Sequence, residues 1–419
     1  MPLLSIGPDA RSMTRHPGLR ALAYPRFRLY LGGQLISLTG SWMQQIATSW
    51  LAYRVTGSSA AVGATLLLAQ LPILLLGPFA GVAGDRFDRQ KLLLMTQVAG
   101  GLQALCFGIS ITYGRPTLSL LLGFSAALGL VNALDTPIRQ SLVPRLVDRR
   151  EDIRNAVALN SVCLHVARFI GATVATLLLT RFAESTCVFV NAASYAASLG
   201  ALIAIGPVNR QGMGNSANGS FREGLRFCVD RAEIRAAFAL LTVASLIVAP
   251  YPTLLPAAIR AAGSHDAGYY ARLMACAAAG SVAAALLLAR WHSDRALLRA
   301  IPISLSIAGV ALGGLGLAIA NLPAWAGMIS VGVTALALTI VVSGVNAFIQ
   351  HHVPDRLRGR VMGLYALSFN GLLPLGGLLA GALADAASPP VILAVMGIIA
   401  VVCAVGGAVA SHRSAPDIK

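Results

Sequence analysis

The sequence carries little charge. Only 11% of its 419 residues are Asp, Glu, Lys or Arg, whereas a soluble globular domain carries about 25%. Hydrophobic residues make up 56%, and the mean hydropathy is +0.73. This composition excludes a soluble enzyme, a disulfide-stapled secreted domain and a disordered chain. It is typical of a helical protein that crosses the membrane several times.

The sequence also lacks the groupings of residues that catalysis or metal binding needs. It has no Walker A loop, no Cys-x-x-Cys spacing, no cluster of metal ligands and no nucleophile with a base beside it. We therefore expect no enzyme activity, no cofactor and no metal. The cysteines are scattered singly, and we interpret them as small core residues. They are Cys106, Cys163, Cys187, Cys228, Cys276 and Cys403.

The formal charge of +16 does not indicate a nucleic-acid-binding protein. Its basic residues recur as short groups between long apolar runs and do not gather in one segment. The partners we expect are a small-molecule substrate and the lipid bilayer, with no nucleic acid. We expect the protein to act as a monomer.

Twelve apolar runs predict twelve membrane-spanning helices in two groups of six. The N-terminal six-helix bundle is expected over 28–207 and the C-terminal bundle over 235–411. A linker at 208–234 separates them: Gln211–Ser220 has a flexible composition, and Phe221–Val229 predicts a short helix on the membrane surface. The predicted spans are 28–52, 60–84, 91–113, 116–138, 155–180, 186–207, 235–260, 266–290, 296–320, 324–349, 359–384 and 389–411.

The charges of the loops indicate the orientation. If the N-terminus is cytoplasmic, the inner segments hold 26 of the 32 basic residues and the outer loops hold only Arg54, Arg115, Arg181 and Arg260. Under the positive-inside rule this asymmetry places both termini in the cytoplasm. Residues 1–27 have no cleavage site after a short apolar core, so we expect a cytoplasmic tail and no signal peptide. A second short tail is expected at 412–419.

Two loop elements recur at matching places in the two halves. Asp85-Arg86 follows the second span and Asp294-Arg295 follows the eighth, an offset of 209 residues. The segment 140–144, QSLVP, follows the fourth span, and 350–354, QHHVP, follows the tenth. These matches indicate a duplicated six-helix unit, and parallel halves with a site between them are a common transporter design.

The loop between the second and third spans holds the sharpest local motif, 81–91, GVAGDRFDRQK. It resembles the loop Gly-x-x-x-Asp-Arg-x-Gly-Arg-Arg-Lys of the major facilitator superfamily, although Asp88 replaces a glycine and Gln90 a basic residue. The resemblance implies two pseudo-symmetric six-helix bundles and a switch at the cytoplasmic side between them. The residues that we assign to this switch are Gly81, Asp85, Arg86, Arg89, Lys91, Asp294, Arg295, Arg358, Gly359 and Arg360.

Other segments resemble a narrower group within that superfamily. Residues 40–45, 137–144, 168–171 and 353–363 are similar to the enterobactin-exporter-like members of the third drug:proton antiporter family. The resemblance covers 24–385. It implies secondary export, with a proton as counter-ion, across a bacterial inner membrane. One departure concerns the fifth span, where Gly171–Ala175 lacks the proline that antiporters usually carry there.

Arg168 lies near the middle of its span, where an arginine costs at least about 2.5–3.5 kcal/mol. We interpret it as a contact for an anionic or catecholate-like substrate, and a purely interhelical bond is the alternative. Uncharged polar residues also interrupt the spans. Gln34 and Gln45 lie three helical turns apart on one face. The candidate substrate cavity comprises Gln34, Gln44, Gln45, Arg168, Asn346 and Asn370, with interhelical hydrogen bonding as the alternative.

Proton coupling has two candidate residues. Asp135 lies near the inner end of the fourth span, where Arg139 four residues on is placed to pair with it. His165 lies one turn before Arg168. The sequence therefore predicts a secondary exporter of a small molecule, with a siderophore as the leading substrate. Multidrug or macrolide-type efflux is the alternative, and a non-transporting membrane sensor is a distant third.

Overall fold

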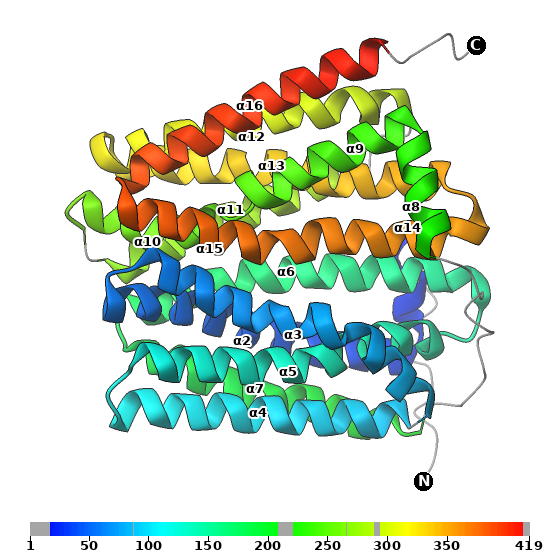
Figure 1. The fold of residues 1–419 in the computed structure, drawn as a ribbon. Coiled ribbons are helices and arrows are strands. Elements are labelled where there is room, and N and C mark those ends of the chain that lie inside the picture. Colours follow the sequence, from blue (N-terminus) through cyan, green and yellow to red (C-terminus); the bar gives the residue numbers. More distant parts are fainter. Residues whose placement is uncertain (1–16, 87, 208–220, 265, 289–293, 414–419) are drawn as a thin grey trace.

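The computed structural model describes residues 17–86, 88–207, 221–264, 266–288 and 294–413. Side chains are described within those ranges except at 17–18, 77–86, 150, 154, 221–222, 294–295, 320, 355–356 and 409–413. Figure 1 shows long helices running side by side, with both chain termini at one end of the bundle. We call that end the terminus end and the opposite one the far end.

The first half consists of six helices that cross the full bundle. A 3₁₀ helix, η1 (Pro17–Ala23), precedes them and docks on α6, where the Asn155 Oδ1 accepts a hydrogen bond from the Ala21 N–H at 2.8 Å. The six helices are α2 (Pro25–Thr56), α3 (Ser59–Arg86), α4 (Arg89–Tyr113), α5 (Leu118–Leu142), α6 (Ile153–Leu179) and α7 (Glu184–Ile205). Short 3₁₀ turns, η2 (Val143–Leu146) and η3 (Arg150–Asp152), join α5 to α6.

The second half repeats this arrangement after a short helix, α8 (Phe221–Asp230), in the segment that links the halves. Two of its six crossings are interrupted by π turns. The first runs through α9 (Ala232–Val243), η4 (Ala244–Val248) and α10 (Tyr251–Ala261). The other comprises α14 (Asp355–Ala366), η5 (Leu367–Gly371) and α15 (Leu372–Ala386). The uninterrupted helices are α11 (Ala267–Leu288), α12 (Asp294–Asn321), α13 (Ala324–His352) and α16 (Pro389–Arg413).

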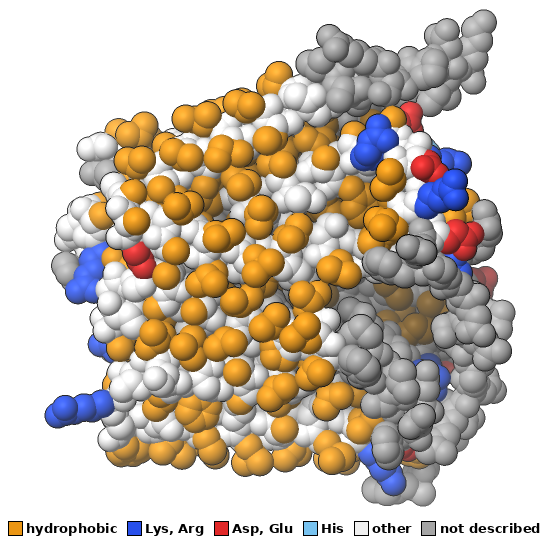
Figure 2. Space-filling model, viewed as in Figure 1, with side chains coloured by type: hydrophobic (Ala, Val, Ile, Leu, Met, Phe, Trp, Pro, Cys, Tyr) orange, Lys and Arg blue, Asp and Glu red, His pale blue; other side chains and the backbone are white. Residues whose placement is uncertain are grey.

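The prediction of an all-α membrane fold is confirmed. Within the described residues, eleven segments are long and apolar enough to cross a bilayer. The helix α2 is not among them, although it runs for 32 residues beside α6 and α7. Hydrophobic side chains dominate the face seen in Figure 2, while charged side chains gather at the two ends of the bundle. That distribution is what lipid around the sides and water at the ends require.

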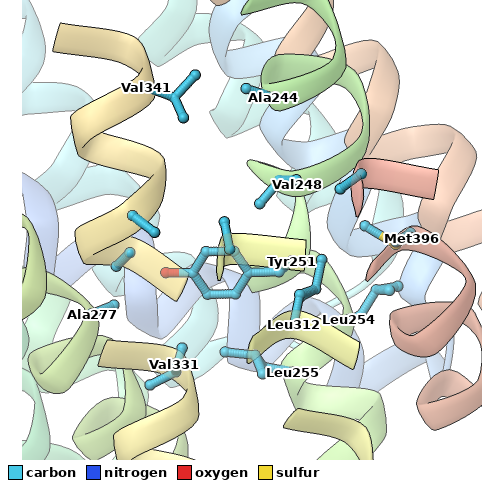
Figure 3. Close-up of a cluster of buried hydrophobic side chains, with 14 of the residues drawn as sticks. Ala244, Val248, Tyr251, Leu254, Leu255, Ala277, Leu312, Val331, Val341 and Met396 are labelled. Carbon is cyan, nitrogen blue, oxygen red and sulfur yellow. The ribbon is translucent and has the colours of Figure 1, made fainter. Parts of the chain in front are cut away.

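The apolar core of the second half is continuous. Figure 3 shows Val248, Tyr251 and Leu254 packing with Leu312 and Val331, which come from four different helical segments. Their relative exposures are all 2% or less. This half therefore has a dense interior of aliphatic side chains, which stabilises helix packing through dispersion contacts.

The two π turns of the second half touch each other. The Ser245 hydroxyl, fully buried in η4, donates a hydrogen bond to the Phe369 carbonyl of η5 at 2.6 Å. Pro250 and Pro374 follow the two turns and supply no backbone N–H. A π turn leaves backbone groups free to bond across helices, and Ser245 satisfies one of them.

Replacing Ser245 by alanine is expected to lower the stability of the second half by about 1 kcal/mol, because the Phe369 carbonyl loses a donor inside the bundle. The thermal unfolding midpoint of purified protein in detergent measures this effect. Ser306→Ala is the matched control, because within the described residues the Ser306 hydroxyl bonds only to Pro302 of its own helix, at 3.1 Å. Equal midpoints for the two variants would contradict the assigned role of the Ser245 bond.

Candidate functional site

A cavity of about 360 Å³ lies inside the first half of the molecule. Its wall is formed by residues between 34 and 195, and α2 and α5 contribute nine side chains each. Nine of the lining side chains carry amides and eight carry hydroxyl groups. Along α2 the lining extends from Gln34 to Ser49, about 22 Å at 1.5 Å per residue. The cavity is therefore elongated, and its wall combines many amide and hydroxyl groups with apolar surface.

The glutamines predicted for the first span all line this cavity. Gln34 is 3% exposed, and Gln44 accepts a hydrogen bond from the Asn191 Nδ2 of α7 at 2.7 Å. Gln45 is exposed and reaches the same wall. Turning these amides inward gives α2 a polar interior face, which explains why α2 alone among the long helices is too polar to count as a membrane span.

An ion pair lies at one end of the cavity. The Asp135 carboxylate pairs with Arg139 one turn later on α5. It also accepts hydrogen bonds from the Thr96 hydroxyl at 2.8 Å and from the Gln97 Nε2 at 2.7 Å, both on α4. Asp135 is only 3% exposed, so its charge depends on these donors. The arrangement holds an acid and a base together against the cavity wall.

Arg168 lies beside the cavity and contacts its wall through an aromatic ring. The guanidinium carbon of Arg168 is 4.9 Å from the centre of the Trp42 ring, and Trp42 lines the cavity. This cation–π contact offsets part of the cost of an arginine in a membrane-spanning helix. Arg168 is half-buried. Trp42 thus contacts both Arg168 and the cavity.

The other predicted residues lie outside this cavity wall. On α13, the Asn346 Oδ1 accepts a hydrogen bond from the Gln350 Nε2 at 2.5 Å. Asn370 is exposed within η5, and His165 is half-buried on α6. The structure therefore brings together the glutamines of α2 and Asp135, and it places the two asparagines of the second half elsewhere.

Several amide residues of the cavity were not predicted. Gln97 and Gln103 on α4, Asn132 and Gln140 on α5 and Asn160 on α6 all line it. The available signal was the same as for α2, an amide inside an apolar run. Four polar atoms of the wall have no hydrogen-bond partner within the described part of the chain. They are Gln34 Nε2, Gln97 Oε1, Gln103 Oε1 and Arg139 Nε.

The predicted switch residues lie at the terminus end. Asp88 caps α4, because its Oδ1 accepts hydrogen bonds from the Gln90 N–H at 2.9 Å and the Lys91 N–H at 3.2 Å. Asp88 is thus the N-cap residue of α4, at the position where the related loops have glycine. Arg89 is half-buried, and Lys91 is exposed. The side chains of Gly81, Asp85, Arg86, Asp294 and Arg295 fall outside the described residues.

The switch segment 358–360 of the second half contacts the linker helix. The Arg360 guanidinium of α14 pairs with Glu223 of α8 at 2.5 Å. Gly224 packs against Arg360 so closely that a Cβ there would lie 2.9 Å from the Arg360 Cβ. Arg358 and Gly359 are exposed. The linker helix is therefore attached to the second half at the terminus end.

The two halves are in close contact at the far end. Trp50 of α2 stacks on Tyr270 of α11 with ring centres 5.8 Å apart, and Arg260 of α10 lies over Tyr53 at 6.0 Å. The helix α3 packs on α15, and α6 packs on α11. At the terminus end, Figure 2 shows the surface recessed between the halves. The molecule is thus sealed at the far end.

Comparison with known proteins identifies transporters throughout. Residues 18–416 match the family model of transmembrane secretion effectors of the major facilitator superfamily. The chain is 23% identical to the staphyloferrin A transporter of Staphylococcus aureus over 363 residues, which cover 85% of this chain and 89% of that one. It is 26% identical to the multidrug efflux pump Tap of Mycobacterium tuberculosis over 377 residues, which cover 86% and 87% of the two chains.

Solved structures agree on the fold. A bacterial homologue of the human lysosomal transporter Spinster, in an inward-facing and unoccupied conformation, superposes with a TM-score of 0.68 at 14% identity, covering 94% of this chain and 99% of that chain. A POT family transporter in complex with 5-aminolevulinic acid gives 0.72 at 10% identity, covering 93% and 96%. At these identities the likeness concerns the fold alone.

The ion pair at the cavity gives a stability prediction. Asp135→Leu is expected to destabilise the protein by about 3 kcal/mol, because Arg139 is left charged without its partner. The double variant Asp135→Leu/Arg139→Leu is expected to recover most of that loss. Thermal unfolding in detergent measures both. A double variant as unstable as the single one would show that Asp135 acts through its hydrogen bonds to α4 and not through the pair.

Proposed function

Because the chain belongs to the transmembrane secretion effector family of the major facilitator superfamily, we propose that it is a secondary active exporter. It moves a small molecule from the cytoplasm across the bacterial inner membrane by alternating access, with protons as counter-ions. Both termini lie in the cytoplasm, and the protein acts as a monomer. The 26 basic residues of the inner segments support this orientation.

The observation that carries the proposal is the polar cavity within a bundle surrounded by lipid. An amide side chain in a membrane interior needs a partner, and the wall keeps four polar atoms without one in the described part of the chain. Two of these atoms, Gln34 Nε2 and Arg139 Nε, are donors. The other two, on Gln97 and Gln103, are acceptors. These four atoms are enclosed by the protein. The nine amides that line the cavity offer both donors and acceptors, which favours an elongated ligand that both donates and accepts hydrogen bonds.

A siderophore is the leading substrate. The polar chelating groups of a siderophore can hydrogen-bond to the amides and hydroxyls of the wall, whereas a flat apolar molecule cannot. Arg168, held against Trp42 at 4.9 Å, offers a positive charge beside that wall to an anionic or catecholate-like group. The named activity of the Staphylococcus aureus relative, staphyloferrin A transport, supports the same class.

Drug efflux is the second candidate, and one observation favours it. Phe107 and Phe124 pair with ring centres 5.0 Å apart, and both line the cavity. With Trp42 and Tyr195 they supply an aromatic portion of the wall that hydrophobic drugs could contact. The Mycobacterium tuberculosis relative is named a multidrug efflux pump.

The coupling proton binds at Asp135 in this proposal. The deprotonated Asp135–Arg139 pair binds polar groups of the substrate, and protonation of the carboxylate from the outer side removes that acceptor and releases the substrate. Loss of the proton to the cytoplasm restores the pair for the next substrate. His165, which lies outside the wall, is the second candidate for this role. Competition between proton and substrate for one charged pair is sufficient to couple their movements.

The switch belongs to the terminus end. There the segment 81–91, its counterpart at 294–295 and the segment 358–360 alternate between holding the halves together and releasing them. The Asp88 cap fixes where α4 begins and so sets the position of Arg89 at the terminus end. The contact of Arg360 with α8 supports a linked motion of linker and second half.

The function is tested first in a strain that lacks this gene and grows under iron limitation. Siderophore is expected to accumulate inside the cells and to fall in the medium, with reversal by the intact gene. Complementation with Arg168→Ala is expected to restore little export, while Arg272→Ala, whose side chain pairs with Asp266 at 2.7 Å, is expected to restore it. Unchanged siderophore levels together with greater sensitivity to hydrophobic antibiotics would establish drug efflux instead.

Coupling is tested with Asp135→Asn in membrane vesicles. The amide cannot carry the proton, so export is expected to lose its dependence on the proton gradient and to become insensitive to a protonophore. Asp230→Asn is the control, because Asp230 is an exposed acid in α8 that pairs only loosely with Arg226 at 3.6 Å. Continued sensitivity of Asp135→Asn to the protonophore would assign coupling to another group.

A further inference from the structure

An acidic side chain of the second half reaches across the far end into the first half. Asp385 lies in the last turn of α15, while α3 of the other half begins at Ser59. The Asp385 Oδ1 accepts a hydrogen bond from the Ser59 N–H at 2.6 Å. Its Oδ2 accepts one from the Ser58 hydroxyl at 2.5 Å and one from the Ala60 N–H at 3.1 Å.

These donors are the groups that a helix leaves unsatisfied at its start. The first N–H groups of a helix have no partner within it and are usually capped by a nearby side chain of the same segment. Ser58 performs part of that task, since its Oγ accepts a hydrogen bond from the Ala61 N–H at 3.1 Å. Asp385 caps the remaining donors from 326 residues away. Its charge also interacts favourably with the positive end of the α3 dipole.

The backbones of α3 and α15 approach closely enough to fix this contact. A Cβ on Gly381 would lie 2.4 Å from the Ser59 carbonyl oxygen, and a Cβ on Gly63 would lie 2.6 Å from that of Gly377. Only glycine permits such an approach. The end of α15 is therefore held directly over the start of α3, where Asp385 meets its donors without bending either helix.

We propose that Asp385 is a gating residue that keeps the far end of the transporter closed by capping α3 from the opposite half. When the halves part at this end, the carboxylate loses three donors and α3 loses its cap together. The contact therefore favours the closed far end over the open one. This role goes beyond the proposed export function, because it makes one carboxylate responsible for the balance between the closed and the open far end.

Other acids at the far end lack this property. Asp266 pairs with Arg272 at 2.7 Å and accepts from the Gly268 N–H at 2.8 Å, all within the second half. Glu184 pairs with Arg54 at 3.0 Å within the first half. Neither contact breaks when the halves separate. Asp266→Asn is thus a matched control for Asp385→Asn. It makes the same change at the same end of the molecule but removes no contact between the halves.

Hydrogen–deuterium exchange of the full chain in lipid nanodiscs tests the proposal without any substrate. Asp385→Asn is expected to speed exchange about tenfold at the start of α3. It is also expected to speed exchange at the far ends of α10 and α11, which the seal otherwise protects. Asp266→Asn is expected to leave the start of α3 and the end of α10 unchanged.

Faster exchange confined to the first turn of α3 would overturn the proposal, because Asp385 would then cap a helix without holding the halves. Unchanged exchange would overturn it as well. If Asp385→Asn speeds exchange throughout the chain, including α8 and α14, the same measurement is made on Ser58→Ala instead. That variant removes one donor of the crossing contact, and the proposal requires faster exchange at α10 and α11 in it too.

Export is measured separately in the strain described above. Asp385→Asn is expected to slow export several-fold, since the cycle must return to a closed far end. Failure of export in every variant and in the parent would count against the proposed function alone. The exchange pattern would still decide the role of Asp385.

Discussion

A bilayer interior offers no hydrogen-bond partner to a peptide group, and the whole molecule is built around that constraint. Helices satisfy their own backbone groups, so the described chain crosses as helices. Where the regular pattern breaks, a local partner replaces the missing one. In the second half the Ala249 N–H bonds to the Ala244 carbonyl at 2.7 Å around the π turn. The Ser245 hydroxyl bonds to Phe369 across the two turns.

The same constraint explains why the interiors of the two halves differ. Polar side chains in the membrane must face protein or a cavity, and in this molecule they converge inside the first half. Asp135 and Arg139 neutralise each other there, so neither charge is left without a partner inside the bundle. The second half has a mainly apolar core (Figure 3), and this core continues into side chains of α2 and α6 in the first half. Two similar folding units thus have different chemistry.

Contacts between the halves must be strong enough to close the protein and weak enough to break in each cycle. Glycine-mediated packing and aromatic stacking meet that requirement because they are short-ranged and leave no buried charge behind when they part. Two contacts between the halves involve charge: Arg260 lies over Tyr53, and Asp385 places a carboxylate on helix donors across the boundary. The exposed position of Asp385 limits the cost of separation, because water can replace the lost donors.

The sequence by itself determined the helical fold, because length and hydropathy act on each span independently of its neighbours. Helical periodicity also placed Gln34 and Gln45 on one face, and both line the cavity. Periodicity, however, shows only which residues share a face of one helix and not which other helix that face contacts. Only the tertiary structure decided that Gln97 of α4 meets Asp135 of α5 and that Asn346 lies elsewhere. Such meetings depend on the rotation and register of packed helices, which distant residues set together.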